Sequence, residues 1–307
     1  MHRLLSSATV TLVGLSSKAL VHSGFASVAV HGLSTLTAAL DSPARDQGQG
    51  IVTVANHIST LDDPLMWSVL PAHYYLSPRT TRWALGASEI MFTNPWVIWI
   101  LISSQGRFFS TFFRLGQTIE TFRGKGIAQP AVDLAIEQLN TGGWVHLYGE
   151  GKVNQSNTYQ VNGNGQLCLK RFKWGVGRIV MESKKPPVII PTWITGFDKL
   201  MPEGRKFPYK FFPRPGAELS VTFGQPLSAD SIRRDLGAHL PLADYGSQSG
   251  LKTGEEPGGW LGTEVQNRMK TAEGLSHIRT RVTGIIHDAV ENLGRSVSAR
   301  LLDNNRI

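Results

Sequence analysis

The sequence predicts an α/β fold, in which a single domain contains a mixed β-sheet flanked by helices. Short apolar runs alternate with helix-like stretches between Gly50 and Phe223, and this alternation is typical of strands connected by helices. Hydrophobic residues make up 41% of the 307 residues and charged residues only 18%. The chain therefore has enough apolar material for a full core, and wholesale disorder is excluded.

The strands and helices follow from local patterns along the chain. The first strand is the β-branched run IVTVA at 51–55, and further strands are expected at 118–122, 144–148, 188–194 and 219–223. A helix should begin at Pro130 and stop at Gly142 and Gly143, because proline suits a first helical turn and glycine follows a last one. A basic helix is expected at about 170–182, and an amphipathic helix from Thr263 to about Ala289.

Two segments are expected to lie outside this regular core. Residues 1–45 are separated as an N-terminal targeting or membrane-associated segment, which leaves 46–307 as the main domain. Within that domain, about 239–262 is expected to be a flexible insertion, because its second half is rich in glycine and polar residues.

The N-terminal segment has the composition of a mitochondrial targeting sequence. Arg3 and Lys18 are its only fixed charges before Asp41, and targeting segments of this kind are basic and poor in acids. The uncharged stretch 19–40 is long enough for a helix on or in a bilayer, although His22 and His31 favour shallow insertion over crossing. A buried core helix is the alternative interpretation of this stretch.

A second apolar segment, PWVIWILIS at 95–103, is predicted to be an interfacial membrane anchor. It is shorter than the ~20 residues that a helix needs to cross the hydrocarbon. Its tryptophans suit the headgroup level, and the arginines on both sides suit lipid phosphate. A buried element is the alternative. The anchor residues are Trp96, Val97, Ile98, Trp99, Ile100 and Leu101, and the flanking arginines are Arg79, Arg82, Arg107 and Arg114.

Charge and cysteine content restrict the classes of partner. With 31 basic and 23 acidic residues, the net charge of +8 favours a polyanionic partner, either nucleic acid or a phospholipid surface. The arginines gather near an apolar stretch and not on a nucleic-acid motif, so no nucleic acid is expected. The single cysteine, Cys168, excludes intramolecular disulfides and thiolate-rich metal sites, and no metal is expected.

The string NHISTLDDP contains the strongest candidate for catalysis. His57 follows a strand and Asp62 comes five residues later, where a turn into a helix brings the carboxylate back to the imidazole. A carboxylate bound to one ring nitrogen allows the other nitrogen to take a proton from a hydroxyl. A substrate hydroxyl activated in this way would attack an ester or thioester, which is acyl transfer. Asp63 is instead interpreted as a helix N-terminal acid.

Three further segments lie at strand ends, where α/β sheets build their sites. In FRGKG, Arg123 and Gly124 suit a phosphate, because arginine binds it and glycine lets the backbone approach. The other two are HLYGEGKVN at 146–154 and VIIPTWITGF at 188–197. A nucleotide-binding P-loop is excluded, because His146 stands where its first glycine is required.

Together these strings resemble the conserved blocks of the glycerophospholipid acyltransferase superfamily, and most closely its phospholipid-lysophospholipid transacylases. The blocks are the H-x-x-x-x-D pair, an arginine-glycine block, a Glu-Gly block and I-I-P at Pro191, and six supporting strings follow in the family's order over 56–227. One departure is Gly149, where most of the superfamily has proline before Glu-Gly. The glycine is expected to loosen that turn.

The resemblance implies a coenzyme A-independent transacylase that remodels the acyl chains of cardiolipin at mitochondrial membranes, with no cofactor. Its partners would be phospholipid, lysophospholipid and an anionic, cardiolipin-rich membrane. His57 would be the base and Asp62 its orienting partner. Arg123, Gly124, Glu150 and Gly151 would bind the substrate's glycerophosphate part, with Lys152 as a helper.

Two alternatives stay open at this stage. An acyl-CoA-dependent lysophospholipid acyltransferase would use the same His57 and Asp62. A non-catalytic protein that binds anionic lipid would explain the basic charge but not the spacing of this pair. A homo-oligomer is compatible with either activity.

Overall fold

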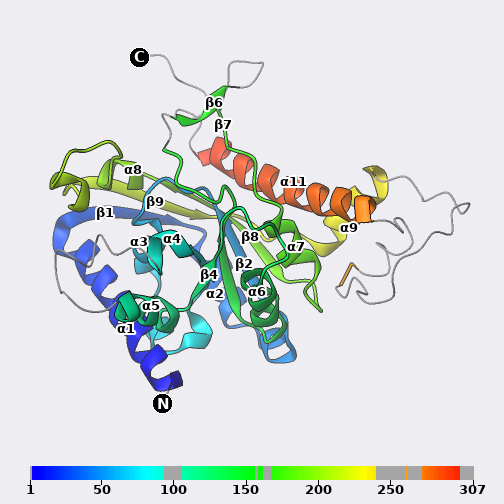
Figure 1. The fold of residues 1–307 in the computed structure, drawn as a ribbon, viewed down its shortest axis with the longest axis horizontal. Coiled ribbons are helices and arrows are strands. Elements are labelled where there is room, and N and C mark those ends of the chain that lie inside the picture. The colour runs from blue at the N-terminus through cyan, green and yellow to red at the C-terminus, as the bar shows by residue number, and fades with distance from the viewer. Residues whose placement is uncertain are drawn as a thin grey trace, which may run out of the picture.

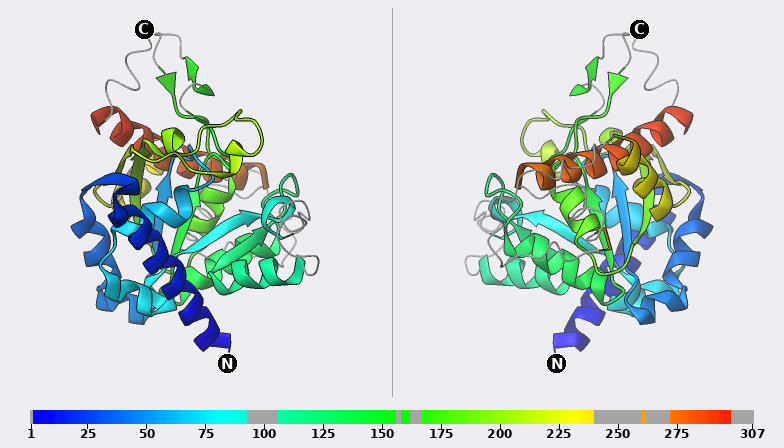
Figure 2. Two further views of the ribbon diagram at one scale, coloured as in Figure 1. Left: turned by 90° about the vertical axis from the view of Figure 1, so that its left-hand side faces the viewer. Right: turned by 90° about the vertical axis from the view of Figure 1, so that its right-hand side faces the viewer.

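A computed structural model shows one sheet of seven strands in the described part of the chain, with helices on both of its faces (Figures 1 and 2). The structure describes residues 2–92, 106–155, 158–161, 167–239, 260–261 and 272–297. The strand order is β1-β9-β8-β2-β5-β3-β4. Neighbouring strands run parallel except β8 and β9, which are antiparallel. The predicted mixed α/β sheet is confirmed.

The strands of the main sheet are short. They are β1 (Ala26–His31), β2 (Ile51–Ala55), β3 (Trp83–Ala87), β4 (Thr118–Thr121), β5 (Trp144–Tyr148), β8 (Val188–Thr195) and β9 (Ala217–Phe223). A separate antiparallel pair contains β6 (Gln160–Val161) and β7 (Leu167–Cys168).

Two apolar clusters cover the faces of the sheet. The helices are α1 (His2–Leu20), α2 (Leu33–Leu40), α3 (Asp62–Met66), α4 (Ser88–Met91), α5 (Gly106–Leu115), α6 (Pro130–Asn140), α7 (Gly175–Met181), α8 (Phe197–Leu200), α9 (Ala229–His239) and α11 (Ala272–Val297). Helices α6, α7, α9 and α11 contribute to one cluster, and α2, α3 and α8 contribute to the other. In β2, Ile51 faces the second cluster while Val52 and Val54 face the first. This strand is fully buried because both of its faces are covered.

The predicted N-terminal helix is present, but it lies at His2–Leu20 and not at 19–40. The chain leaves the helical conformation at Gly24 (φ +82°) and turns again at Gly32 (φ +67°). Residues 26–31 between these glycines form β1, which pairs with β9 at the edge of the sheet. The stretch 19–40 is therefore not one helix, and 26–45 belongs with the main domain and not with a separate N-terminal segment.

Among the described residues, one helix is long and apolar enough to cross a membrane, at Arg3–Phe25. Its polar side chains face the domain: Ser6 donates to the Leu115 carbonyl at 2.8 Å, and Lys18 donates to the Leu70 carbonyl at 3.0 Å. Its leucines face outward, and Leu4 and Leu12 are 76% and 64% exposed. The polarity of α1 is thus reversed relative to a helix that covers a soluble core.

Two other boundaries differ from the predictions. Helix α7 begins at Gly175, because the Lys173 N–H bonds to the Gly149 carbonyl and holds the preceding basic residues in a loop. Trp260 and Leu261 fall inside the predicted flexible insertion but pack on the core, where Leu261 is only 1% exposed. Residues 240–259 lie outside the described residues. Helix α11 confirms the predicted C-terminal helix from Ala272 onward.

Candidate active site

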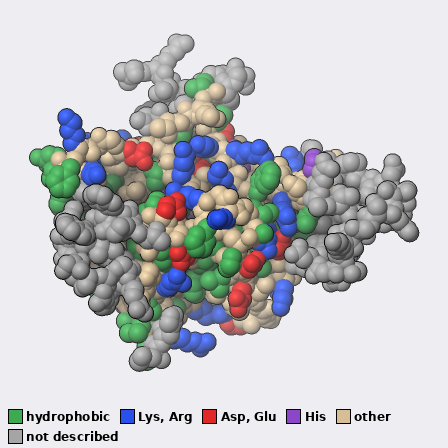
Figure 3. Space-filling view, viewed as in Figure 1, with side chains coloured by type: hydrophobic (Ala, Val, Ile, Leu, Met, Phe, Trp, Pro, Cys, Tyr) green, Lys and Arg blue, Asp and Glu red, His purple; other side chains and the backbone are tan. Residues whose placement is uncertain are grey.

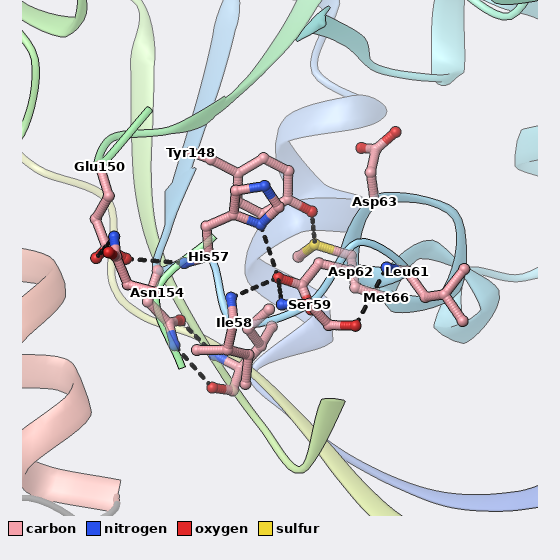
Figure 4. Close-up of polar contacts among 12 residues, drawn as sticks. His57, Ile58, Ser59, Leu61, Asp62, Asp63, Met66, Tyr148, Glu150 and Asn154 are labelled. Atoms are coloured by element: carbon pink, nitrogen blue, oxygen red, sulfur yellow. Dashed lines mark hydrogen bonds and ion pairs between the residues drawn. The ribbon is translucent and has the colours of Figure 1, made fainter. Parts of the chain in front are cut away.

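The loop between β2 and α3 brings His57 and Asp62 together. At the end of β2, the Asn56 side chain exchanges two hydrogen bonds of 2.9 Å with the backbone of Ile194, which fixes the start of the loop. Asp62 begins α3, and its Oδ2 lies 2.8 Å from His57 Nδ1 (Figure 4). The predicted pairing of these two side chains is confirmed by this contact.

The Asp62 carboxylate accepts hydrogen bonds from the loop that precedes it, and these bonds stabilise the loop. Its Oδ2 also accepts the backbone N–H groups of Ile58 at 2.7 Å and Ser59 at 2.8 Å. Asp62 is completely buried, and burial raises the pKa of its carboxyl while the hydrogen bonds from His57, Ser59 and Ile58 lower it. Because the carboxylate accepts from Nδ1–H, the proton-accepting nitrogen of His57 is Nε2. Within the described part of the chain, Nε2 has no hydrogen-bond partner.

Tyr148 packs against the imidazole ring of His57. The rings of His57 and Tyr148 are stacked, with their centroids 4.1 Å apart and their planes 20° apart. The Tyr148 hydroxyl points away from His57 and donates to the sulfur of Met66 at 3.3 Å (Figure 4). The sequence prediction missed this residue. The available signal was that Tyr148 is the last residue of the predicted strand 144–148. When β5 pairs with β2, Tyr148 lies opposite Ala55, the last residue of β2.

Glu150 lies behind the histidine and holds its backbone. Its Oε1 accepts the His57 N–H at 3.0 Å, and its Oε2 accepts the Asn154 side-chain N–H at 2.6 Å. The backbone N–H of Asn154 also donates to the backbone carbonyl of His57 at 2.7 Å. Glu150 is 0% exposed, and burial raises the pKa of its carboxyl to about 7. The sequence analysis predicted Glu150 as a substrate-binding residue, and the structure adds these contacts with the histidine loop. Asn154 was not predicted at all.

His57 opens onto a large cavity of about 1600 Å³. Apolar side chains that line it include Val10, Leu85, Phe92, Phe113 and Val132. Cationic side chains also line it: Arg82, Arg123, Lys152, Lys170, Arg171 and Lys173. A ligand that joins apolar chains to anionic groups has the chemistry that matches these walls.

The turn after β4 places Arg123 on this cavity. Gly124 and Gly126 adopt φ values of +79° and +77°, and open space surrounds the position of a Cβ at either glycine. Arg123 is half exposed and lies 3.1 Å from Glu89. The turn therefore leaves room for a ligand beside a guanidinium, as the sequence analysis predicted.

The turn after β5 is held tightly, although Gly149 replaces the family's proline. A Cβ on Gly149 would lie 2.4 Å from the Phe172 ring, so this ring occupies the space of a side chain. The Gly149 carbonyl also accepts the Lys173 N–H at 2.8 Å. The expectation of a loosened turn is therefore wrong. Gly151 follows at φ +72°, a conformation that glycine adopts most readily.

The hydrogen bond from Lys173 to Gly149 holds a segment with two lysines beside Lys152. These lysines, Lys170 and Lys173, were not predicted to belong to the site. Lys170 lies close enough that the Lys152 ammonium lowers the pKa of Lys170. Lys173 packs against Gly151, and all three lysines line the cavity. The sequence analysis placed Lys170 and Lys173 in a helix and so missed them. We call Lys152, Lys170 and Lys173 the lysine cluster.

The arginines expected to flank a membrane anchor have other partners. Arg82 is largely buried in an ion pair with Asp63, which also accepts the Trp67 indole N–H at 3.2 Å. Arg79 pairs with Asp46 at 2.6 Å. Arg114 pairs with Glu120 at 2.5 Å. The headgroup role predicted for Arg82 is therefore wrong, while the anchor itself, at 96–101, and the Arg107 side chain lie outside the described residues.

The part of the chain that the structure describes contains no group of three or more His, Cys, Asp or Glu side chains that could hold a metal ion.

The chain has relatives among known proteins. The chain matches the Acyltransferase family over residues 27–195, which include His57, Asp62, Glu150 and all of β1 except Ala26. It is 34% identical to Taffazin of Dictyostelium discoideum over 81% of this chain and 80% of that protein. It is 35% identical to N-acylphosphatidylethanolamine synthase of Arabidopsis thaliana over 66% of this chain and 63% of that protein.

A third relative extends the comparison. The chain is 37% identical to Tafazzin of Drosophila melanogaster over 62% of this chain and 44% of that protein, so it spans less than half the length of this relative. Two relatives, Taffazin of Dictyostelium discoideum and Tafazzin of Drosophila melanogaster, thus match this chain at 34% and 37% identity. The chain is a phospholipid acyltransferase that belongs to the tafazzin family.

Proposed function

We propose that this acyltransferase is a coenzyme A-independent phospholipid-lysophospholipid transacylase that remodels the acyl chains of cardiolipin. The observation that carries the proposal is the His57–Asp62 pair, joined at 2.8 Å and open to a cavity with apolar and cationic walls. A lysophospholipid brings a hydroxyl, acyl tails and a phosphate, so it matches the base, the apolar walls and the cationic walls respectively.

In the proposed reaction, His57 Nε2 takes the proton of the lysolipid hydroxyl as the oxygen attacks the ester carbonyl of a donor phospholipid. The buried Asp62 stabilises the imidazolium that forms, because its carboxylate accepts the hydrogen bond from Nδ1–H and carries the opposite charge. Collapse of the tetrahedral intermediate breaks the donor ester bond, and the imidazolium returns its proton to the leaving oxygen. The products are a new phospholipid and a new lysophospholipid.

The membrane supplies both substrates, and α1 supports attachment to it. This helix presents exposed leucines outward and binds the domain through its polar side chains, which favours a helix lying in the interface over one that crosses. Attachment to mitochondrial membranes, on the intermembrane-space side, completes the proposal. It is supported by the acid-free, basic N-terminus.

The test uses purified full-length protein with a phospholipid that carries a labelled acyl chain and with monolysocardiolipin as the acceptor. We expect the label to reach cardiolipin without acyl-CoA, and His57→Ala to abolish this transfer. Transfer only from acyl-CoA would reject the transacylase in favour of an acyl-CoA-dependent lysophospholipid acyltransferase. Equal transfer by wild type and His57→Ala would reject the assigned base.

Phosphatidylethanolamine, used as a second acceptor, distinguishes the proposed reaction from the activity in the name of the Arabidopsis relative, N-acylphosphatidylethanolamine synthase. If phosphatidylethanolamine receives the label on its amine while monolysocardiolipin does not, the proposed acceptor is wrong. If no acceptor is labelled while the protein binds anionic vesicles, the chain is a non-catalytic lipid-binding protein.

A further inference from the structure

The loop between α8 and β9 exposes aromatic side chains that the active site does not use. We call residues 203–214 the aromatic loop. Phe207, Tyr209 and Phe212 are 68%, 67% and 61% exposed. Three large aromatic side chains in one short loop, each mostly in solvent, form an apolar surface that a soluble protein rarely leaves uncovered.

Basic residues are interleaved with these aromatic side chains. The aromatic loop contains four basic residues, Arg205, Lys206, Lys210 and Arg214, and one acidic residue, Glu203. Lys206 and Arg214 have no ion-pair partner among the described residues. Aromatic rings prefer the boundary between hydrocarbon and headgroups, and lysine and arginine bind the phosphates there. This combination of side chains matches an anionic lipid surface better than a protein groove.

The base of the aromatic loop meets the chain shortly after the apolar helix α1. Gly216, just after the loop, donates its N–H to the carbonyl of Phe25 at 2.8 Å, and Ala217 pairs with Ala26. Phe25 is the last residue of the long apolar stretch that includes α1. The left view of Figure 2 shows α1 and the segment around α8 on the same side of the molecule. Figure 3 shows apolar and basic side chains together at the corner where this segment lies in Figure 1.

The base of the aromatic loop is attached to the catalytic loop. The Gln155 side chain donates to the carbonyls of Met201 at 3.1 Å and Ile58 at 3.3 Å. Its oxygen accepts the Glu203 N–H at 3.1 Å. The Arg214 N–H bonds to the Leu200 carbonyl at 2.8 Å and closes the other end. The aromatic loop is therefore fixed relative to the loop that contains His57.

We infer that the aromatic loop is a second membrane-contact element, which inserts Phe207, Tyr209 and Phe212 into an anionic lipid interface beside α1. The inference does not depend on the reaction that the active site performs. Two attachment points, α1 and the aromatic loop, fix the rotation of the domain on the membrane, which one helix alone would leave free.

The first experiment measures sedimentation with vesicles of phosphatidylcholine, alone or mixed with phosphatidylglycerol. The test variant is Phe207→Ser/Tyr209→Ser/Phe212→Ser in the full chain. We expect its partition onto mixed vesicles to fall about tenfold or more, because each inserted aromatic ring contributes apolar burial. Val161→Ser replaces another exposed apolar residue, in β6, and should bind as wild type does. Unchanged binding by a folded triple variant would overturn the inference.

The second experiment reads insertion directly and avoids the risk that the triple variant misfolds. Since Cys168 is the only cysteine, a Cys168→Ser background allows one polarity-sensitive dye to be attached at Tyr209→Cys or, as a control, at Val161→Cys. We expect a blue shift of emission at position 209 when mixed vesicles are added, and none at 161. No shift at 209 while the protein pellets with vesicles would overturn the inference, as would a shift caused by self-association without lipid.

Discussion

The carboxylate of Glu150 accepts the backbone N–H of His57 at 3.0 Å, although the two residues lie 93 positions apart in the chain. The bond joins the turn after β5 to the loop after β2, so the Glu-Gly block acts on the histidine's backbone. In this structure Glu150 is a positioning residue for His57.

Glu150→Gln should therefore lower kcat more than it raises KM. The amide loses one of the two acceptor oxygens, and the displaced His57 loop should reduce kcat by about 10- to 100-fold, since small misplacements of a catalytic group are costly. Steady-state kinetics with varied acceptor concentration will measure both constants. Arg123→Gln, on the open turn, is the matched comparison and should mainly raise KM. A raised KM with intact kcat in Glu150→Gln would instead support the substrate contact expected from the sequence.

Asp62→Asn should lower kcat by roughly 10³- to 10⁴-fold, because the neutral amide neither orients Nδ1–H nor stabilises the imidazolium. His57→Ala should have an effect of similar size. The double variant should be no worse than the single ones, because the two side chains act as a unit. Fully additive losses would show that Asp62 acts independently of His57.

Lys170→Gln/Lys173→Gln should raise KM for an anionic acceptor by about tenfold or more, since hydrogen bonds from charged groups contribute roughly 1.5–3 kcal/mol each. The effect should shrink as salt concentration increases. Lys184→Gln/Lys185→Gln removes two exposed lysines that do not line the cavity, and it should leave KM unchanged. Equal effects of both double variants would mean that net charge, and not the lysine cluster, binds the acceptor.

Asp63→Asn should destabilise the fold by about 3–5 kcal/mol, because it leaves the largely buried Arg82 without its counter-charge. Urea unfolding monitored by tryptophan fluorescence will measure the change. Asp46→Asn breaks the exposed pair with Arg79 and should cost at most about 1 kcal/mol. If the two variants lose the same free energy of unfolding, the charge of Arg82 is solvated by water in the cavity and does not need Asp63.

His146 should make the fold sensitive to mild acid. Burial lowers the pKa of this histidine from 6.5 to about 3, so the unfolded chain binds its proton first. Its contribution to stability is complete above pH 6.5 and is lost as the pH falls towards 3, with a slope of up to about 1.4 kcal/mol per pH unit. The difference in unfolding free energy between wild type and His146→Gln should follow this slope. A difference that does not vary with pH would contradict the lowered pKa.

Local signals were enough to predict the centre of the sheet and the contact between His57 and Asp62. The strand at 51–55, the helix from Pro130 and the strand at 144–148 were predicted from apolar runs and from proline and glycine at their ends. His57 and Asp62 belong to one loop, so their spacing alone brought them together.

The missed features depend on contacts between distant segments. The strand β1 was read as helix because its uncharged sequence allows either conformation, and pairing with β9 decides between them. The positions of Tyr148 and Glu150 follow from the pairing of β2 with β5. The lysine cluster forms because Phe172 fills the space beside Gly149. None of these contacts has a signal within a short stretch of sequence.

All the bonds that hold Asp62 Oδ2 come from residues 57–59, a few positions along the same loop. The walls that would sort acyl chains by length or unsaturation come from other elements, including α1, α4 and α5. If His57 and Asp62 act as proposed, chain selectivity can therefore change by substitution in these helices while the pair that transfers the proton stays the same. Enzymes with this loop can diverge in the lipids that they prefer without having to rebuild their chemistry.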